Sequence, residues 1–210
     1  LLSLVVTLCL GLLLLLGFAW WAVNSALPTL VAETMEQVTD YRVEIADAGF
    51  YPLRPHVRMT GLSIDRKGAE GVVEPFIRVN RLEADLDFQS FDTTTRVVDR
   101  LFLDLHSLRL PDDASGAGRL HGFVTDMLGK LSLPQLGEGE TPESGTWFIR
   151  ELVLRVEQVE LDKGAGVQTV PVDYQQRWEG VSSWQPVLKT IADDAGKRQL
   201  QPVAEALNDL

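Results

Sequence analysis

The sequence predicts an α+β fold in which one N-terminal transmembrane helix precedes a curved, bulged, mainly antiparallel β-sheet with a few amphipathic helices. Three observations carry this prediction. Leu1 to Val23 form an apolar run without a charged side chain. Several later segments alternate apolar and polar residues with the two-residue period of strands. Other segments repeat apolar residues at helical spacing.

The uncharged run predicts a transmembrane anchor at residues 1–25. At about 1.5 Å per residue, such a helix reaches roughly 35 Å and crosses a hydrocarbon core of about 30 Å. Trp20 and Trp21 lie where an aromatic belt meets the membrane surface. A cleaved signal peptide is the competing interpretation, but its apolar core usually covers only about 7–15 residues. Since neither an initiator Met nor a basic leader is present, we expect the natural protein to begin upstream.

The remainder of the chain is an acidic body. The net charge of −11 disfavours nucleic acid, whose phosphates require a basic surface. The single cysteine, Cys9, lies within the apolar run, so the body has no thiol for a disulfide, a metal or catalysis. About 185 residues outside the anchor form one ordinary domain, or one domain with a small appendage.

The body divides into consecutive segments by composition and period. A short amphipathic connecting helix is expected at 26–40, followed by a β-rich domain at 41–135. The Gly/Pro/Glu segment at 136–146 has the composition of a flexible, exposed loop. Residues 147–210 are expected to add further strands and C-terminal helices to the same body. Helical period is clearest at 119–133 and 184–208.

Four predicted strands share one pattern, in which the alternation changes phase once along each strand. The third of them shows it with apolar residues at Leu101, Leu103, Leu105, Leu108 and Leu110. Because successive side chains point to opposite faces, such a slip exposes half of the apolar set unless a bulge absorbs one residue. Kinks in neighbouring strands curve a sheet. A bulge or kink is predicted at each of four sites, namely Gly61, Asn80–Arg81, His106–Ser107 and Glu157–Gln158.

The two faces of the predicted sheet differ. One carries charged residues and is expected to face water; the other is aliphatic and continues through Leu86 and Phe88 at the end of one strand. The aliphatic face must be covered by the chain's own helices or by an external molecule. The predicted helices have about the area to cover most of it, which leaves a margin for a lipid or a protein partner. The residues expected to face that lipid or partner are Val43, Ile45, Val57, Met59, Leu101, Leu103 and Leu105.

No residues follow a catalytic pattern, so we expect a protein without enzymatic activity, metal or cofactor. His56, His106 and His121 lack a carboxylate or second histidine at metal-ligand spacing. His106 coincides with a predicted bulge, where exposure to solvent is the simplest interpretation. Asp112–Asp113 and Asp193–Asp194 lack the further oxygen ligands of a calcium loop. The serines lack a nucleophile elbow, and the glycines do not form a phosphate-binding loop.

Four strand motifs follow the apolar span and the short helix. They are Asp40-Tyr41-Arg42-Val43-Glu44-Ile45, Phe50-x-Pro52-Leu53, Val57-x-Met59-x-Gly61-Leu62-x-Ile64 and Val79-x-Arg81-Leu82-x-Ala84-Asp85-Leu86-Asp87. This order resembles the N-terminal part of AsmA-like envelope proteins, which are related in type to TamB and chorein-like proteins. The resemblance covers roughly the first half of the chain well. It implies a single-pass protein of the bacterial inner (cytoplasmic) membrane whose β-groove projects into the periplasm and handles lipid.

We therefore expect a non-enzymatic, inner-membrane-anchored periplasmic protein that acts in envelope maintenance or lipid handling through an apolar β-sheet face. The alternative is a structural or accessory subunit that docks onto a larger membrane protein complex. The expected partners are the lipid bilayer, through the N-terminal helix, and either phospholipid or such a complex. With five or six predicted strands, the sheet is too short to form a groove across an envelope, so the alternative stays open.

Overall fold

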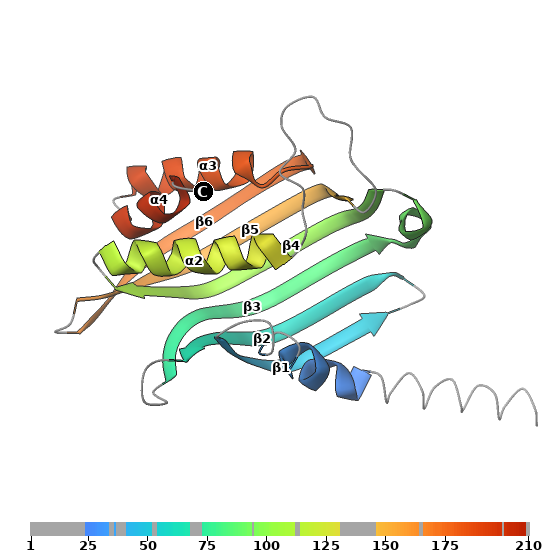
Figure 1. Cartoon of the computed structure of the whole chain (residues 1–210), viewed down its shortest axis with the longest axis horizontal. Helices are drawn as coiled ribbons and strands as arrows, with labels where there is room; N and C mark the ends of the chain where they lie inside the picture. The colour runs from blue at the N-terminus through green and yellow to red at the C-terminus, as the bar shows by residue number, and fades with distance from the viewer. Residues whose placement is uncertain are drawn as a thin grey trace, which may run out of the picture.

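A mixed β-sheet forms the centre of the molecule. The computed structural model describes residues 24–33, 36, 41–51, 54–67, 73–93, 95–111, 114–130, 146–163, 166–198 and 200–208. The sheet has six strands in the order β1-β2-β3-β4-β5-β6 (Figure 1). The strands are β1 (Tyr41–Tyr51), β2 (His56–Lys67), β3 (Val73–Asp87), β4 (Thr95–Pro111), β5 (Thr146–Asp162) and β6 (Val167–Val181).

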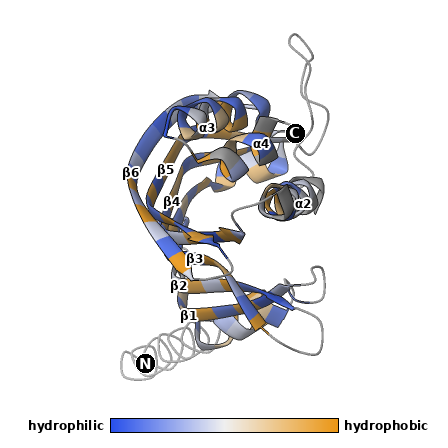
Figure 2. Cartoon of the chain, turned by 90° about the vertical axis from the view of Figure 1, so that its left-hand side faces the viewer, coloured by the Kyte–Doolittle hydropathy of each residue, from blue (hydrophilic) through white to orange (hydrophobic). Residues whose placement is uncertain are grey.

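The helices lie on one side of this sheet. Figure 2 shows α2, α3 and α4 inside the curve of the strands, so the molecule has two layers. The predicted α+β class with a few helices is therefore confirmed. The chain is helical at 24–33, which overlaps the connecting helix predicted at 26–40 but begins two residues before it. The other helices are η2 (Phe88–Asp92), α2 (Ala114–Lys130), α3 (Gln185–Lys197) and α4 (Gln201–Asn208).

Two predicted segments lie wholly or almost wholly outside the described residues. The anchor, with Trp20 and Trp21, is one of them, because the description begins at Asn24. The loop at 136–146 is the other, up to its last residue. Within the described part of the chain, no helix combines the length and the apolar character needed to cross a bilayer.

One strand pair differs in direction from the others. Four pairings are antiparallel, as predicted, whereas β4 and β5 run parallel. Parallel neighbours need a crossover connection, and α2 lies within the connection between β4 and β5. The alternation of side chains determines the face of a strand but not its direction, so the sequence pattern did not reveal this pair.

All six strands kink at the same level. The residues left out of the strand pairing there, called the first kink row, are Ala46, Gly61, Asn80, His106, Glu157, Val172 and Asp173. Gly61 and Asp173 have φ angles of 61° and 43°, and the register shifts beside Asn80 and Glu157. Leu103 and Leu108 pack with the same core cluster from opposite sides of the row. Register shifts confirm the predicted sites at Asn80–Arg81, His106–Ser107 and Glu157–Gln158 as bulges. At Gly61 the register is the same on both sides, so this predicted site is a kink without an extra residue.

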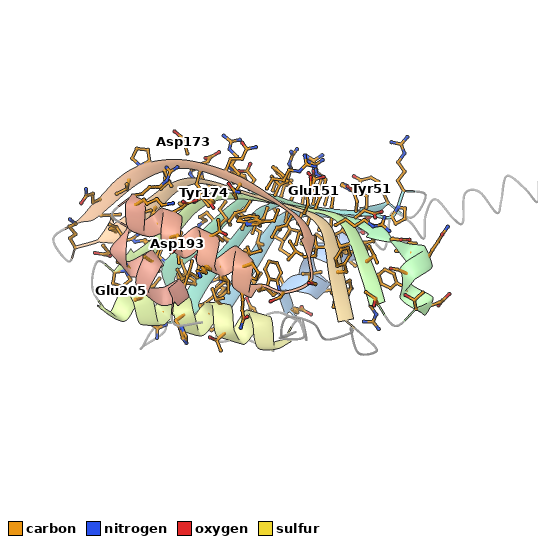
Figure 3. The ribbon with its side chains drawn as sticks, turned by 90° about the horizontal axis from the view of Figure 1, so that it is seen from above. Tyr51, Glu151, Asp173, Tyr174, Asp193 and Glu205 are labelled. Carbon is orange, nitrogen blue, oxygen red and sulfur yellow. The ribbon has the colours of Figure 1, made fainter. Side chains whose placement is uncertain are left out.

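A second kink row, which was not predicted, crosses three strands. It comprises Asp99, Arg150 and Gly180, which are also left out of the pairing. The ladder between β3 and β4 shifts register at the same level, between Asp85 and Leu86. Figure 3 shows the strands arched over the helices, as kinks that bend in one sense produce.

The main core lies between the helices and the part of the sheet beyond the first kink row. Its buried residues include Ile64 and Leu110 from the sheet, Leu120 from α2, Ala192 from α3 and Val203 from α4. The outer face is charged, as predicted, and carries ion pairs between neighbouring strands. These include Arg58 with Glu83, Arg100 with Glu151, Arg155 with Asp104, and Arg177 with Glu151.

The helix at 24–33 approaches the free edge of β1. The Phe50 N–H donates a hydrogen bond of 2.8 Å to Asn24 Oδ1. The Val43 N–H donates one of 3.0 Å to Glu36 Oε1. Edge strands present unpaired backbone groups, so these two side chains satisfy donors that no neighbouring strand reaches.

One predicted strand end is wrong. The alternation places Phe88 on the inward face, but β3 ends at Asp87. The Asp87 carboxylate accepts a hydrogen bond of 3.1 Å from the Gln89 N–H and thereby caps η2. Phe88 leaves the sheet as a result, and 42% of its surface is exposed.

Candidate apolar site on the concave face

The concave face between the two kink rows is aliphatic and only partly buried. Val57 lies opposite Ala84, which lies opposite Leu101. Met59 lies opposite Leu82, which lies opposite Leu103. The partly buried side chains therefore form a continuous surface across three strands. This surface, called the apolar patch, consists of Val57, Met59, Leu82, Ala84, Leu86, Leu101, Leu103 and Leu105. Leu86 is its outermost member and pairs with Val98, just beyond the second kink row.

The first kink row separates this patch from the closed core. Beyond the row, the inward residues of the same three strands are buried beneath the helices. They include Leu62, Ile64, Ile77, Val79 and Leu108. On the near side, Leu82, Leu103 and Leu105 are partly buried against the main cluster, and Ala84, Leu86 and Leu101 are partly buried against a second, smaller cluster. Val57 and Met59 belong to neither core cluster. The patch is thus the least covered part of the inward face in β2 and its neighbours.

Of the seven residues predicted to face a lipid or a partner, five belong to the patch. Val43 and Ile45 do not, because the first kink row places them on the side of the closed core. Val43 is only 3% exposed, and Ile45 packs against the main cluster. The five residues that the structure brings together are Val57, Met59, Leu101, Leu103 and Leu105.

Sequence reasoning missed three members of the patch. Leu82, Ala84 and Leu86 alternate along β3, and this alternation was visible in the sequence. Their partners across the strands were not, because pairing register depends on turn geometry and on kinks as well as on alternation.

A polar cluster on the outer face fixes the first kink row. His106 Nδ1 and Glu157 Oε2 are 2.7 Å apart, and Asn80 Nδ2 donates to Glu157 Oε1 at 3.2 Å. The hydrogen bond from His106 lowers the pKa of Glu157 below its usual value. These residues come from β3, β4 and β5, and His106 is exposed as predicted. The cluster therefore joins three strands where their ladder pairing is interrupted.

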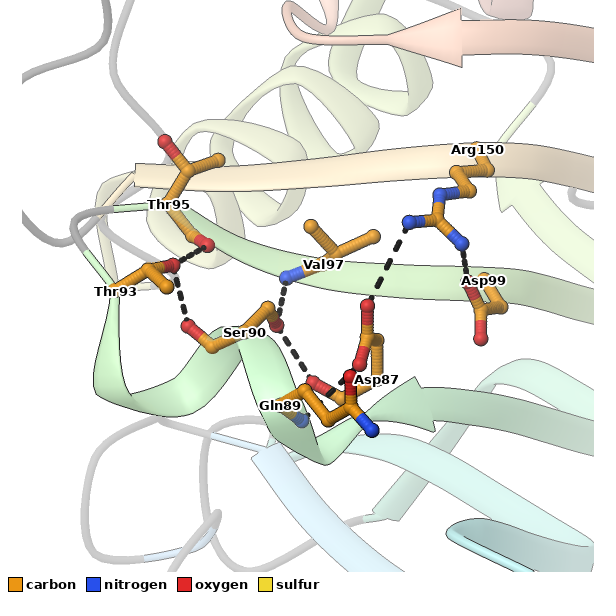
Figure 4. Close-up of polar contacts among 8 residues, drawn as sticks. All are labelled: Asp87, Gln89, Ser90, Thr93, Thr95, Val97, Asp99 and Arg150. Carbon is orange, nitrogen blue, oxygen red and sulfur yellow. Dashed lines mark hydrogen bonds and ion pairs between the residues drawn. The ribbon is translucent and has the colours of Figure 1, made fainter.

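Ion pairs fix the second kink row in the same way. Arg150, from β5, pairs with Asp99 of β4 and lies 3.5 Å from Asp87 of β3 (Figure 4). Both borders of the apolar patch thus have polar connections on the opposite side of the sheet. The described residues contain no group of three or more His, Cys, Asp or Glu side chains that could hold a metal ion.

An open hollow of about 500 Å³ lies at the start of β2, lined by Tyr51, Arg54, His56, Arg58 and Asp85. His56 Nδ1 and Asp85 Oδ1 are 2.7 Å apart. A carboxylate orients an imidazole in this way in hydrolases, but there the imidazole activates a serine, threonine or cysteine. None of the lining residues is of these types.

No family model, curated protein or solved structure matches this chain. The concave face offers an aliphatic surface. Such a surface can bind an apolar ligand or an apolar partner.

Proposed function

We propose that this chain is a non-enzymatic, membrane-anchored protein of the AsmA-like type that binds lipid acyl chains on its apolar patch, in envelope maintenance or lipid handling. The observation that carries the proposal is the partly exposed aliphatic surface across β2, β3 and β4. Complete burial of a Leu or Val side chain is worth roughly 1.5–3 kcal/mol. An apolar occupant that completes the burial of several such side chains therefore gains affinity without polar contacts.

The shape of the patch favours a flexible methylene chain. Its side chains are aliphatic, so it lacks the polar groups that orient most small-molecule ligands. The two kink rows keep the face concave along the strands. An acyl chain adapts to such a surface because binding costs it conformational entropy but no hydrogen bonds.

The proposed location is the inner membrane, with the body in the periplasm. The uncharged run from Leu1 to Val23 supplies the proposed anchor. The acidic body suits this arrangement, since long domains cross the membrane with little dependence on their charge.

Site-specific photo-crosslinking tests the proposal with a matched pair of neighbouring positions. Leu103 belongs to the patch, whereas the Phe102 ring lies on the outer face with the Arg81 guanidinium 5.0 Å from its centre. A photoreactive amino acid at position 103 is expected to capture phospholipid in native membranes, and the same probe at position 102 is not. Capture of only α2, α3 or α4 by position 103 would show that the face is a closed core.

The same experiment separates lipid handling from the alternative role as a subunit. A lipid adduct at position 103 supports the proposal, whereas a stoichiometric protein adduct there supports docking onto a larger complex. Met59→Gln, which introduces an amide at nearly constant volume, is expected to reduce the copurified lipid. Arg58→Gln, on the outer face, is the control and is expected to leave the lipid content unchanged.

A further inference from the structure

We propose that the end of the sheet formed by η2 and the start of β5 lies in the headgroup region of the membrane that holds the anchor. This inference rests on the proposed anchor and adds an orientation to it: the strands meet the bilayer end-on. Four features of this end carry it, namely a row of aromatic rings, the two exposed phenylalanines of η2, the position of Asn24 and the exposed arginines.

Aromatic rings follow one another along this end of the sheet. The ring centres of Phe50 and Phe88 are 5.9 Å apart, and those of Phe88 and Phe91 are 5.6 Å apart. The Trp147 ring continues the row, 6.0 Å from Phe91. Phe88 and Phe91 are 42% and 39% exposed. Two exposed phenylalanines beside a tryptophan are typical of surfaces whose apolar side enters the membrane interface.

η2 exposes two phenylalanines, together with Gln89 and Asp92, while its serine is buried. Ser90 is buried, with 6% of its surface exposed, whereas the phenylalanines on either side of it face outward. The Ser90 hydroxyl donates to the Asp87 carbonyl at 2.6 Å and accepts from the Val97 N–H at 2.7 Å (Figure 4). The Thr93 hydroxyl donates to the Ser90 carbonyl at 2.7 Å. These hydrogen bonds on the inner side of η2 thus keep the Phe88 and Phe91 rings on its outer side.

The chain reaches this end directly from the uncharged run. Asn24 is the first described residue and follows Val23 in the sequence. Its side chain accepts the hydrogen bond from the Phe50 N–H, next to the first ring of the row. A membrane span that ends at Val23 therefore places the aromatic end of the sheet, rather than its far end, next to the membrane surface.

Basic side chains flank the aromatic row on an otherwise acidic protein. Arg54 and Arg96 are exposed there, and the Arg96 guanidinium lies 5.6 Å from the centre of the Trp147 ring. Arginine beside tryptophan suits the headgroup region, because the guanidinium can pair with lipid phosphates while the ring contacts the upper acyl chains. The segment from Asp87 to Arg96 has two carboxylates, of which Asp87 caps η2 and pairs with Arg150.

End-on docking gives the apolar patch direct access to lipid. Val57, at the near margin of the patch, lies opposite Phe50 in the strand register. Leu86, at another margin, is followed within two residues by Phe88. An acyl chain that leaves the bilayer at the aromatic row therefore meets the patch without crossing a polar surface.

Depth-dependent quenching in liposomes tests this orientation on the full chain. Single cysteines are placed at Phe91 and at Val167 in a Cys9→Ser background, and each carries the same environment-sensitive fluorophore. Val167 is the matched control because it is 43% exposed and begins β6 at the far end of the sheet. The liposomes contain phosphatidylcholine and phosphatidylglycerol, with nitroxide groups near the top of the acyl chains.

The probe at position 91 is expected to be quenched by the nitroxide lipids and protected from iodide in water. The probe at position 167 is expected to be quenched by iodide in water and not by the nitroxide lipids. The double substitution Phe88→Gln and Phe91→Gln, with the fluorophore at Tyr51→Cys, is expected to abolish the lipid quenching at position 51. Circular dichroism of this variant checks that the body still folds.

The outcomes separate failure of the docking from failure of the anchor. Carbonate extraction of the same liposomes shows whether the protein is held by a span. If the protein is retained but the probe at 91 stays in water, the docking is overturned while the anchor stands. Equal lipid quenching at 91 and 167 means that the sheet lies flat, which also overturns it. Release of the protein by carbonate overturns the anchor and, with it, the inference.

Discussion

Gly61 is the single residue on which the first kink row depends most directly. Its φ of 61° lies in the left-handed region, and a Cβ added there would be 2.8 Å from the Ala46 Cβ. The left-handed conformation costs a non-glycine residue roughly 1–2 kcal/mol, and the overlap adds to this cost. Gly61→Ala is therefore expected to lower the free energy of unfolding by about 2–4 kcal/mol in urea titration.

Gly118→Ala is the control for this substitution. A Cβ at Gly118, within α2, meets no atom within 4 Å. Alanine in a helix interior is favoured over glycine by roughly 0.5–1 kcal/mol, so the control is expected to keep or raise the stability. Equal losses in the two variants would contradict the special role of Gly61.

Tyr174 has a buried hydroxyl without a hydrogen bond. Among the described residues, its Oη finds no partner, although Asp194 and Arg198 lie nearby. An unpaired buried polar group costs about 1–3 kcal/mol. Tyr174→Phe removes the group at nearly constant volume and is expected to raise the free energy of unfolding by about 1 kcal/mol. A loss of stability would show that the hydroxyl has a partner.

Tyr174 also predicts how the stability of the protein changes at alkaline pH. Burial, assisted by the negative charge of Asp194, raises the pKa of Tyr174 to about 12. The unfolded chain has a tyrosine pKa of about 10, so the folded state favours the neutral phenol. This contribution is complete below pH 10 or so and is lost as the pH rises to about 12. The stability advantage of Tyr174→Phe should therefore grow over this interval, as measured by urea titration at each pH.

Among the elements, η2 is held by one buried serine. Ser90→Ala removes the acceptor of the Val97 N–H and is expected to cost about 1–3 kcal/mol. Faster hydrogen exchange at the Val97 amide is the accompanying local change. Gln89→Ala, at an exposed position of the same helix, is expected to stay within about 0.5 kcal/mol of the natural protein. If Ser90→Ala changes neither the stability nor the exchange of the Val97 amide, other contacts hold η2 in place.

The sequence predicted the kinks of the strands unevenly. The first row was visible because at least two inward residues lie on each side of it, as with Leu103, Leu105, Leu108 and Leu110 in β4. Beyond the second row, β4 has Val98 and β5 has Ile149, each only a short step from the strand end. One or two residues do not establish a second phase, so the three-residue step from Val98 to Leu101 was overlooked.

The aromatic end was not predicted, for a different reason. Phe88 continues the alternation of β3 in the sequence, and alternation alone does not show that the Asp87 side chain ends the strand by capping η2. The patch was found more easily, because Leu101, Leu103 and Leu105 lie on one strand. Its members on β3 required the register between strands, which local pattern does not supply.

At the scale of the whole molecule, the parallel pair joins the two halves of the chain. β4 and β5 pair from Thr95 with Thr146 to Pro111 with Asp162. Residues from both halves also share the main core, including Leu110 and Val159. A protease site inserted in the predicted loop at 136–146 should therefore yield two fragments that coelute in size-exclusion chromatography and separate only in urea. Separation under native conditions would contradict a single body.

The two kink rows also give the sheet a mechanical property. Cross-strand hydrogen bonds make a sheet stiff, and along each row several of these pairings are missing at one level. The two kink rows therefore divide the sheet into three stiff parts. Bending concentrates at the rows, so a force on the molecule rotates these parts against one another while each keeps its own shape. The middle part carries the apolar patch, and the angles at its two borders determine how wide that surface opens.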